Sequence, residues 1–132
     1  MAAEVLASSG VTVTVYDQRA SVGRKFVLAG RSGLNLTNDE SIDRFITRYG
    51  ESSPRLESAL RAFTPDDLRA WAESLGERSF IGSGGRVFPD SMRATPLLRA
   101  WISRLNSLGV EFRTRARFCG WDGDSVLIDV DD

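Results

Sequence analysis

Apolar residues recur with a helical period in two long segments of the chain. After Thr95–Pro96, leucine, tryptophan and isoleucine return every three or four residues as far as Leu108, just before a glycine. The second segment begins at Thr64, a hydroxyl side chain that can cap a helix, and continues with proline and Asp67 to Gly76. Both patterns predict amphipathic helices with one buried face. In the second helix this predicted core face consists of Leu68, Trp71, Ala72 and Leu75.

Three further helices are predicted from composition and end signals. Met1–Ser9 is rich in alanine and is followed by Gly10, a typical helix terminator. The segments Ser41–Tyr49 and Ser53–Phe63 are the other two. In contrast, Gly23–Asn38 is interrupted by glycines, and we expect it to be irregular apart from a short apolar patch.

Strand patterns lie near both ends of the chain. Val11–Tyr16 is largely β-branched and is followed by an acid. Val110–Phe118 alternates apolar with mostly charged side chains, which predicts one half-buried strand. Asp122–Gly123 is a hairpin turn signal, so a final strand is expected over Ser125–Val130. Shorter extended segments are expected at Phe80–Ile81 and Arg86–Pro89.

The composition is that of an ordinary globular domain. The 132 residues are 42% hydrophobic and 27% charged, with a formal net charge of −1. No excess of positive charge favours nucleic acid as a partner, and no apolar run approaches the roughly 20 residues of a membrane helix. No signal peptide is visible in the sequence. We therefore expect a cytoplasmic protein with no membrane and no nucleic-acid partner.

Two residue counts exclude common chemistries. The chain has no histidine, which removes Ser-His-Asp and Cys-His catalysis and the usual zinc sites. Its single cysteine, Cys119, cannot form an internal disulfide, which fits a reducing compartment. We expect Cys119 to be a small buried side chain and not a reactive thiol.

The order of elements around Asp17 indicates a nucleotide-binding unit. In a Rossmann unit a strand, a glycine-rich turn and a helix precede a second strand, and the acid at its end accepts a hydrogen bond from a ribose hydroxyl. Asp17 ends a predicted strand, but too few residues precede it for the first strand and the turn. We therefore expect the chain to be an N-terminally truncated piece of a larger protein. The alternative is a strand-end acid with no ligand.

Two motifs carry a resemblance to a known family. Gly23–Asn38 reads G-R-K-F-V-L-A-G-R-S-G-L-N-L-T-N, and Gly85–Ser91 reads G-R-V-F-P-D-S and is followed by Arg93 and a helix. Together they resemble the BaiN-like, aminoacetone-oxidase-like family of FAD-binding flavoproteins, and the likeness extends over nearly the whole chain. Residues 31–35 depart from the G-G-R-C-N of many members, which leaves any substrate-side role of that loop open.

The resemblance implies an α/β fold, namely a partial Rossmann-like FAD-binding domain with a helical insertion and a C-terminal β-hairpin. It implies a single domain over residues 1–132, incomplete at both ends, that lacks the first strand and the glycine-rich turn. The implied cofactor is FAD, with NAD(P)H as a candidate electron donor and a small organic molecule as substrate of the parent oxidoreductase. The fragment alone is expected to be inactive. No catalytic residue and no metal ligand is assigned.

The resemblance and the residue types together assign residues to the ADP half of FAD. Asp17 would bind the ribose, while Arg24 and Lys25 would neutralise the pyrophosphate. The alternative for Arg24 and Lys25 is a solvated loop. Glycines would let the backbone approach the dinucleotide closely at Gly23, Gly30 and Gly33.

The remaining assignments concern the two ends of the cofactor. Asn35 and Thr37 would supply polar groups near the isoalloxazine edge. The alternative for this segment is a helix cap or an Asx turn, with Asn38 as its candidate. By resemblance, the backbone near Phe118 would lie along the adenine, whereas the Phe118 side chain is expected in the core.

Two rival interpretations stay open. One is a non-catalytic remnant with the same fold and no flavin. The other is a small interaction module whose contact surface is the strand face with Arg113, Arg115 and Arg117, although a solvated face paired with acids is the simpler interpretation of these arginines. Loss of a central parallel strand would expose the edges of its neighbours, so we also expect the fragment to self-associate.

Overall fold

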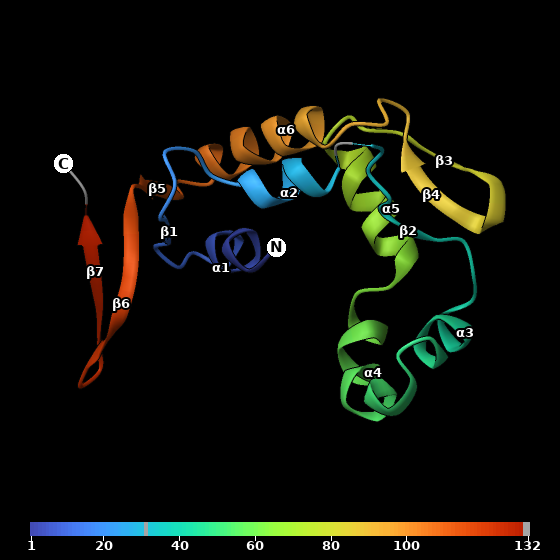
Figure 1. Ribbon diagram of the computed structural model, residues 1–132, viewed down its shortest axis with the longest axis horizontal. Coiled ribbons are helices and arrows are strands. Elements are labelled where there is room, and N and C mark those ends of the chain that lie inside the picture. The colour runs from blue at the N-terminus through green and yellow to red at the C-terminus, as the bar shows by residue number, and fades with distance from the viewer. Residues whose placement is uncertain (31, 131–132) are drawn as a thin grey trace. The chain divides into compact units, whose positions relative to one another are not determined.

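The computed structural model describes residues 1–30 and 32–130 (Figure 1). Its contacts form two compact units, which are described separately. Unit 1 consists of Met1–Leu28 and Leu98–Asp132, and unit 2 consists of Ala29–Leu97. Helices and strands of both parallel and antiparallel pairing occur in the chain, so the predicted α/β class is confirmed. The single-domain assignment stays a prediction.

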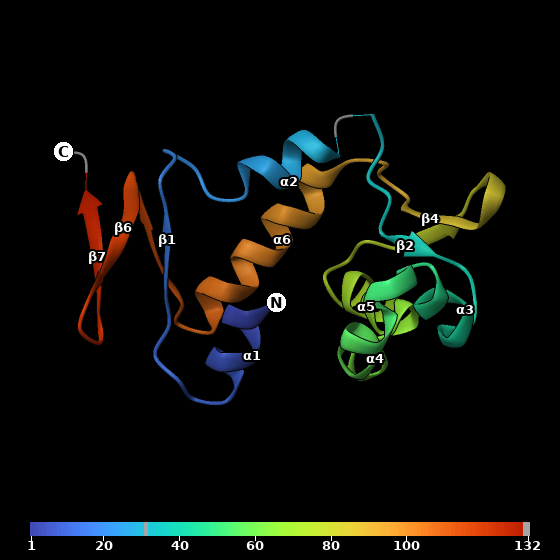
Figure 2. The same cartoon turned by 60° about the horizontal axis from the view of Figure 1, so that its bottom comes forward.

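Unit 1 contains a parallel strand pair made from distant parts of the sequence. Strand β1 (Thr14–Asp17) pairs with β5 (Glu111–Thr114) in a register that places Thr14 opposite Glu111 and Asp17 opposite Thr114. Strands β6 (Ala116–Asp122) and β7 (Ser125–Val130) form the predicted C-terminal hairpin. Both views show β6 beside β1 (Figures 1 and 2).

Three helices accompany these strands. Helix α1 (Ala2–Ser8) is tied to the long helix α6 (Ala94–Ser107) through Glu4. The Glu4 carboxylate accepts hydrogen bonds from Trp101 Nε1 at 2.8 Å and from Arg104 Nη1 at 3.1 Å. Helix α2 (Arg24–Ala29) lies alongside α6 in both views (Figures 1 and 2). The most buried apolar side chains of this unit are Leu105, Val110 and Ala116.

Unit 2 combines a small antiparallel sheet with three α-helices. The sheet has the order β2-β4-β3, and its strands are β2 (Thr37–Asn38), β4 (Arg86–Pro89) and β3 (Ser79–Ile81). The helices are α3 (Ile42–Thr47), α4 (Ser53–Ala62) and α5 (Pro65–Ser74), with 3₁₀ turns at Gly50–Ser52 and Ser83–Gly85. Its buried apolar side chains include Leu34, Ile46, Ala72, Val87, Ala94 and Leu97.

The predicted start of α5 is confirmed in detail. The Thr64 hydroxyl accepts a hydrogen bond from the Asp67 backbone N–H, and the Asp67 carboxylate accepts one from the Thr64 backbone N–H at 2.8 Å. This reciprocal arrangement is a capping box, and it satisfies donors that a helix end otherwise leaves unpaired. Of the predicted core face, Ala72 is fully buried, whereas the three larger side chains are only half-buried.

The prediction that Gly23–Asn38 is irregular was wrong. Residues 24–29 form helix α2, and Thr37–Asn38 form strand β2. The glycines on either side of α2 favoured a loop in the prediction, although residues 24–29 between them can form a helix. Gly23, just before α2, adopts a φ of +73°, which glycine tolerates in a turn. Its missing Cβ also leaves room for the Leu98 side chain of α6. Packing against α6 therefore stabilises a helix too short to be stable alone.

The prediction of one continuous strand over Val110–Phe118 was also wrong. The strand is broken at Arg115, which has a φ of +54° and whose backbone N–H donates to the Arg19 carbonyl at 3.0 Å. Chain direction therefore changes between β5 and β6. A register shift between Phe118 and Gly120 then interrupts the alternation of faces within the hairpin.

Two burial predictions in the hairpin were wrong for the same reason. Phe118 is 57% exposed, and Cys119 is an exposed free thiol. Among the described aromatic rings, Phe118 pairs with that of Trp121, which is itself exposed, in a T-shaped arrangement with a centroid distance of 6.0 Å. The hairpin has side chains on two faces, and the alternating pattern alone does not specify that either face is covered.

Candidate functional site

A cavity of about 310 Å³ lies at the carboxyl end of β1 and is called here the β1 pocket. It brings together four of the residues predicted to bind the cofactor, Asp17, Gly23, Arg24 and Lys25. All of its lining residues belong to unit 1, and the remaining four are Gln18, Arg19, Phe26 and Leu28. The end of a parallel strand is where nucleotide-binding sheets place their ligands.

Asp17 is held in a defined orientation at the edge of this pocket. It is the last residue of β1, is half-buried, and accepts a hydrogen bond through Oδ1 from the Arg19 backbone N–H at 2.8 Å. Within the described chain no donor contacts its second oxygen. That oxygen can therefore accept a hydrogen bond from a ligand hydroxyl, such as that of a ribose.

The charge of the β1 pocket favours an anion. Three of its lining residues are cationic, Arg19, Arg24 and Lys25, against the single acid Asp17. All three cations are exposed, and none makes an ion pair within the part of the chain that the structure describes. A pyrophosphate between these side chains would meet unpaired donors. The residue types of the pocket thus fit the ribose and pyrophosphate of a dinucleotide.

The three predicted cofactor glycines have reasons within the chain to lack a side chain. A Cβ on Gly23 would lie 2.8 Å from the Leu98 methyl groups, and a Cβ on Gly30 would lie 2.7 Å from that of Ala94. Gly33 has a φ of +132°, a conformation that other residues rarely adopt. Packing and backbone conformation therefore account for these glycines with or without a ligand. Arg31, where the family pattern changes, lies outside the described residues.

A second cavity, called here the unit 2 pocket, has a volume of about 460 Å³. The predicted residues Asn35 and Thr37 lie on its wall. Thr37 is buried in β2 opposite Val87. With its amide turned to donate, Asn35 hydrogen-bonds the carbonyl oxygens of Thr37 at 2.8 Å and Val87 at 3.2 Å, so it also braces β2 against β4.

Asn38 belongs to β2, so its interpretation as a helix cap or an Asx turn was wrong. Helix α3 follows Ser41 instead, and no cap hydrogen bond from that side chain is present. Among the described residues, Gly33 and Phe118 line neither pocket. The proposed roles of these two residues toward a cofactor stay predictions.

Most of the unit 2 pocket is not predicted by the sequence. Its remaining lining residues come from β2 and the residue before it and from the helices and turns that follow, and they are Leu36, Asn38, Phe45, Arg48, Tyr49, Leu60, Phe63, Thr64, Pro65 and Leu68. Arg48 donates through Nε to Glu40, and this hydrogen bond raises the pKa of the Arg48 guanidinium above its ordinary value. The sequence signals were the helical patterns of residues 41–75, which do not reveal that helices α3 to α5 enclose a cavity.

Two of the three arginines of the last strands, Arg113 and Arg117, are paired with acids, as the simpler interpretation predicted. Arg113 contacts Glu111 at 3.2 Å, and Arg117 contacts Asp129 at 3.2 Å across the hairpin. All four side chains are more than half exposed. Arg115, between them, lies at the break that separates β5 from β6. A shared basic contact surface is therefore not supported by these pairs.

Two further classes of site are not found among the described residues. They contain no group of three or more histidine, cysteine, aspartate or glutamate side chains that could hold a metal ion. Across residues 1–30 and 32–130, each helix is too short or too polar to cross a membrane.

Comparison with known proteins identifies the family of the chain. A search of curated proteins finds none that matches the chain. The sequence model of the HI0933-like protein Rossmann domain, however, matches residues 1–132, the whole length of the chain. The match agrees with the β1 pocket, whose acid and cations follow a strand that pairs in parallel. The chain therefore belongs to the HI0933-like Rossmann family of FAD-binding flavoproteins.

Proposed function

We propose that the chain binds the ADP half of FAD in the β1 pocket, as part of an oxidoreductase that acts on a small organic substrate. The observation that supports this proposal most directly is the pocket itself. It collects an oriented carboxylate and three unpaired cations at the end of a parallel strand. When bound, the flavin would supply the electron-transfer chemistry, while the chain binds and orients it.

Each lining residue has a separate task in this proposal. Asp17 accepts a hydrogen bond from a ribose hydroxyl through the oxygen that Arg19 does not occupy. Arg24 and Lys25, on the first turn of α2, neutralise the pyrophosphate. Asn35 and Thr37 are proposed to face the isoalloxazine, on the family resemblance. On the same ground NAD(P)H is the proposed electron donor and the cytoplasm the proposed compartment.

A titration of the 132-residue chain with FAD tests the ribose assignment. Asp17→Ala should raise the dissociation constant about 5- to 100-fold, because it leaves ligand donors without an acceptor. Asp124→Asn, which changes an exposed acid in the hairpin turn, is the matched control and should leave the constant unchanged. Equal FAD affinity of the Asp17→Ala and Asp124→Asn proteins would remove Asp17 from the site.

The pyrophosphate assignment needs its own variants. The double variant Arg24→Gln/Lys25→Gln should bind FAD at least about tenfold more weakly, because charge-assisted contacts to phosphate are lost. The control is Arg113→Gln/Arg117→Gln, which removes the same charge from residues that are paired with acids. If both double variants lose the same affinity, only the overall charge matters and the pocket is not the phosphate site. A visible absorbance scan of each protein reports flavin occupancy and separates a flavoprotein from a remnant without flavin.

A further inference from the structure

We propose that the unit 2 pocket binds an aromatic carboxylate, with its ring among Phe45, Tyr49 and Phe63 and its carboxylate on Arg48. As a binding site the proposal stands on the pocket alone. The statement that such an acid is the substrate class of the enzyme rests on the proposed flavin function. Both pocket walls and all contacts used below lie within unit 2.

The body of the pocket suits an aromatic ring. Its volume of about 460 Å³ falls in the range of small-molecule sites. Phe45 and Tyr49 already pack edge to face, with centroids 5.7 Å apart and an interplanar angle of 70°. Tyr49 and Phe63 are 40% and 39% exposed, so two large side chains that line the cavity are only partly covered by the chain. The ring of a ligand would bury this surface.

The charge of the pocket suits a single carboxylate. Among the described residues that line it, Arg48 alone is charged and none is acidic, so an anion would meet no like charge on this wall. Glu40 is shared by two guanidinium groups, those of Arg44 and Arg48. The group formed by Arg44, Arg48 and Glu40 therefore carries a net charge of +1.

Glu40 also orients Arg48. The Glu40 side chain is only 7% exposed, and its Oε1 accepts from Arg48 Nε. Its Oε2 is buried without a hydrogen bond in the described chain, with Arg44 Nε at 3.5 Å. Because the contact to Arg48 uses Nε, the two terminal nitrogens stay available, and within the described residues nothing accepts from them. A planar carboxylate can accept from both at once.

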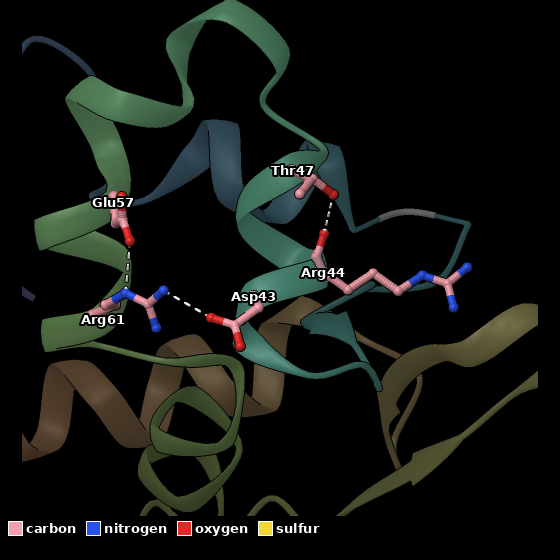
Figure 3. Close-up of polar contacts among 5 residues, drawn as sticks. All are labelled: Asp43, Arg44, Thr47, Glu57 and Arg61. Atoms are coloured by element: carbon pink, nitrogen blue, oxygen red, sulfur yellow. Dashed lines mark hydrogen bonds and ion pairs between the residues drawn. The ribbon is translucent and has the colours of Figure 1, made fainter.

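Helices α3 and α4, which form part of the pocket wall, are joined by an ion pair between side chains that do not line the pocket. Arg61 of α4 donates to Asp43 of α3 at 2.7 Å and to Glu57 of its own helix at 2.9 Å (Figure 3). Thr47 closes the end of α3 through a hydrogen bond from its hydroxyl to the Arg44 carbonyl. In Figure 3 the Arg44 side chain extends away from this bridge, and Arg44 does not line the pocket.

This arrangement supplies a matched pair of variants. Arg44 and Arg48 are one turn apart on the same segment, both contact Glu40, and both are more than half exposed, but only Arg48 lines the pocket. Arg48→Gln and Arg44→Gln therefore remove equal charge and disturb the same carboxylate. The ligands are 2-naphthoate, titrated into the full chain by calorimetry, and its neutral analogue 2-naphthamide.

We expect saturable binding of 2-naphthoate to the unchanged chain. Arg48→Gln should weaken it about tenfold or more, the loss typical of a charge-assisted hydrogen bond, while Arg44→Gln should change it less than about twofold. Binding of 2-naphthamide should be weaker and equal in all three proteins. Arg48→Lys keeps the charge but not the fork of donors, so it should give an intermediate loss. Circular dichroism of each variant reports whether the helices are retained.

Several results would overturn the proposal. These are the absence of saturable 2-naphthoate binding to the unchanged chain, equal losses in the Arg44 and Arg48 variants, or equal affinity for the acid and the amide. The Arg24→Gln/Lys25→Gln protein controls for binding of 2-naphthoate in the β1 pocket, and its affinity for this ligand should be unchanged. The same proteins titrated with FAD keep the two proposals apart. FAD binding that depends on Asp17, without naphthoate binding, would leave the flavin proposal standing and reject this one. Naphthoate binding without Asp17-dependent FAD binding would reject the flavin proposal, and with it the substrate class, but would keep the binding site.

Discussion

Adding one methyl group at Gly30 should destabilise unit 2 measurably. The Cβ of an alanine there would lie 2.7 Å from the Ala94 Cβ and 3.4 Å from both the Ala94 nitrogen and the Leu34 Cβ. Carbon atoms in contact normally sit about 3.5–4.0 Å apart. Ala94 is 2% exposed, and its methyl group has no rotamer by which to move away. Relief therefore requires movement of the start of α6 against the loop that follows α2.

The expected magnitude combines two opposing effects. Overpacking of a filled core costs about 1–3 kcal/mol. Gly30 does not adopt a left-handed φ, so alanine would also restrict the unfolded chain and return roughly 0.4–1 kcal/mol. The net loss for Gly30→Ala should be about 1–2 kcal/mol in the free energy of unfolding. Urea titration followed by circular dichroism measures this difference.

A second substitution isolates the contact. Ala94→Gly alone should also destabilise the chain, because it removes a buried methyl group and places glycine at the start of a helix. Combined with Gly30→Ala it should restore part of the loss, with a coupling free energy of about 1 kcal/mol or more. Strictly additive losses would refute the packing explanation.

Three other features give predictions of their own. Glu4→Ala should lower the free energy of unfolding by about 1–3 kcal/mol in urea titrations followed by tryptophan fluorescence, because it removes the acceptor of the Trp101 indole N–H. The hydrogen bonds from the Thr64 hydroxyl and then from the Thr64 backbone hold the pKa of Asp67 below its ordinary value of 3.8. A carboxylate whose pKa is lower in the folded state stabilises the fold above its unfolded pKa, and this contribution is lost as pH falls through the folded value. Asp67→Asn should therefore lower the melting temperature at pH 7, and the difference should shrink as the pH is taken below 3.8. Cys119, an exposed free thiol, should react stoichiometrically with an aromatic disulfide reagent in the native protein.

Each of these expectations has a result that contradicts it. Wild-type stability of the Glu4→Ala protein would mean that its contact with α6 contributes nothing. A stability difference for Asp67→Asn that is constant from pH 7 to pH 3 would show that the carboxylate charge is not involved. A native thiol that reacts only after denaturation would show that Cys119 is covered, and Ser125→Cys, in the same hairpin, is the positive control for an accessible position.

Local signals in the sequence predicted local structure well. The capping box of α5 was predicted because Thr64 and Asp67 carry both of its hydrogen bonds within one turn. Helix α2 was not predicted, because its stability comes from Leu98, which lies far from it in the sequence. The break at Arg115 depends in the same way on a distant carbonyl, that of Arg19.

The same difference between local and distant contacts separates the two pockets. Asp17, Arg24 and Lys25 lie close together in the sequence, so their place around one pocket could be anticipated from a strand, a turn and a family motif. The unit 2 pocket could not, since it requires helices α3 to α5 to close over the polar residues of β2. Phe118 was expected in the core because alternation shows which side chains share a face but not what covers that face.

The hydrogen bond between Glu4 and Trp101 joins residues 97 positions apart. Strand β1 likewise pairs with β5, which is synthesised much later. In the sequence, unit 2 lies between these two parts, and its contacts form within Ala29–Leu97. During synthesis at about 5–20 residues per second, the first residues of unit 1 therefore emerge roughly 5–20 s before the residues they contact. Throughout that interval the β1 edge has no partner from β5, and unpaired edges are where nascent chains associate wrongly. Slower translation of residues 98–114 would lengthen the interval and should raise the aggregated fraction, although the finished sequence would be identical.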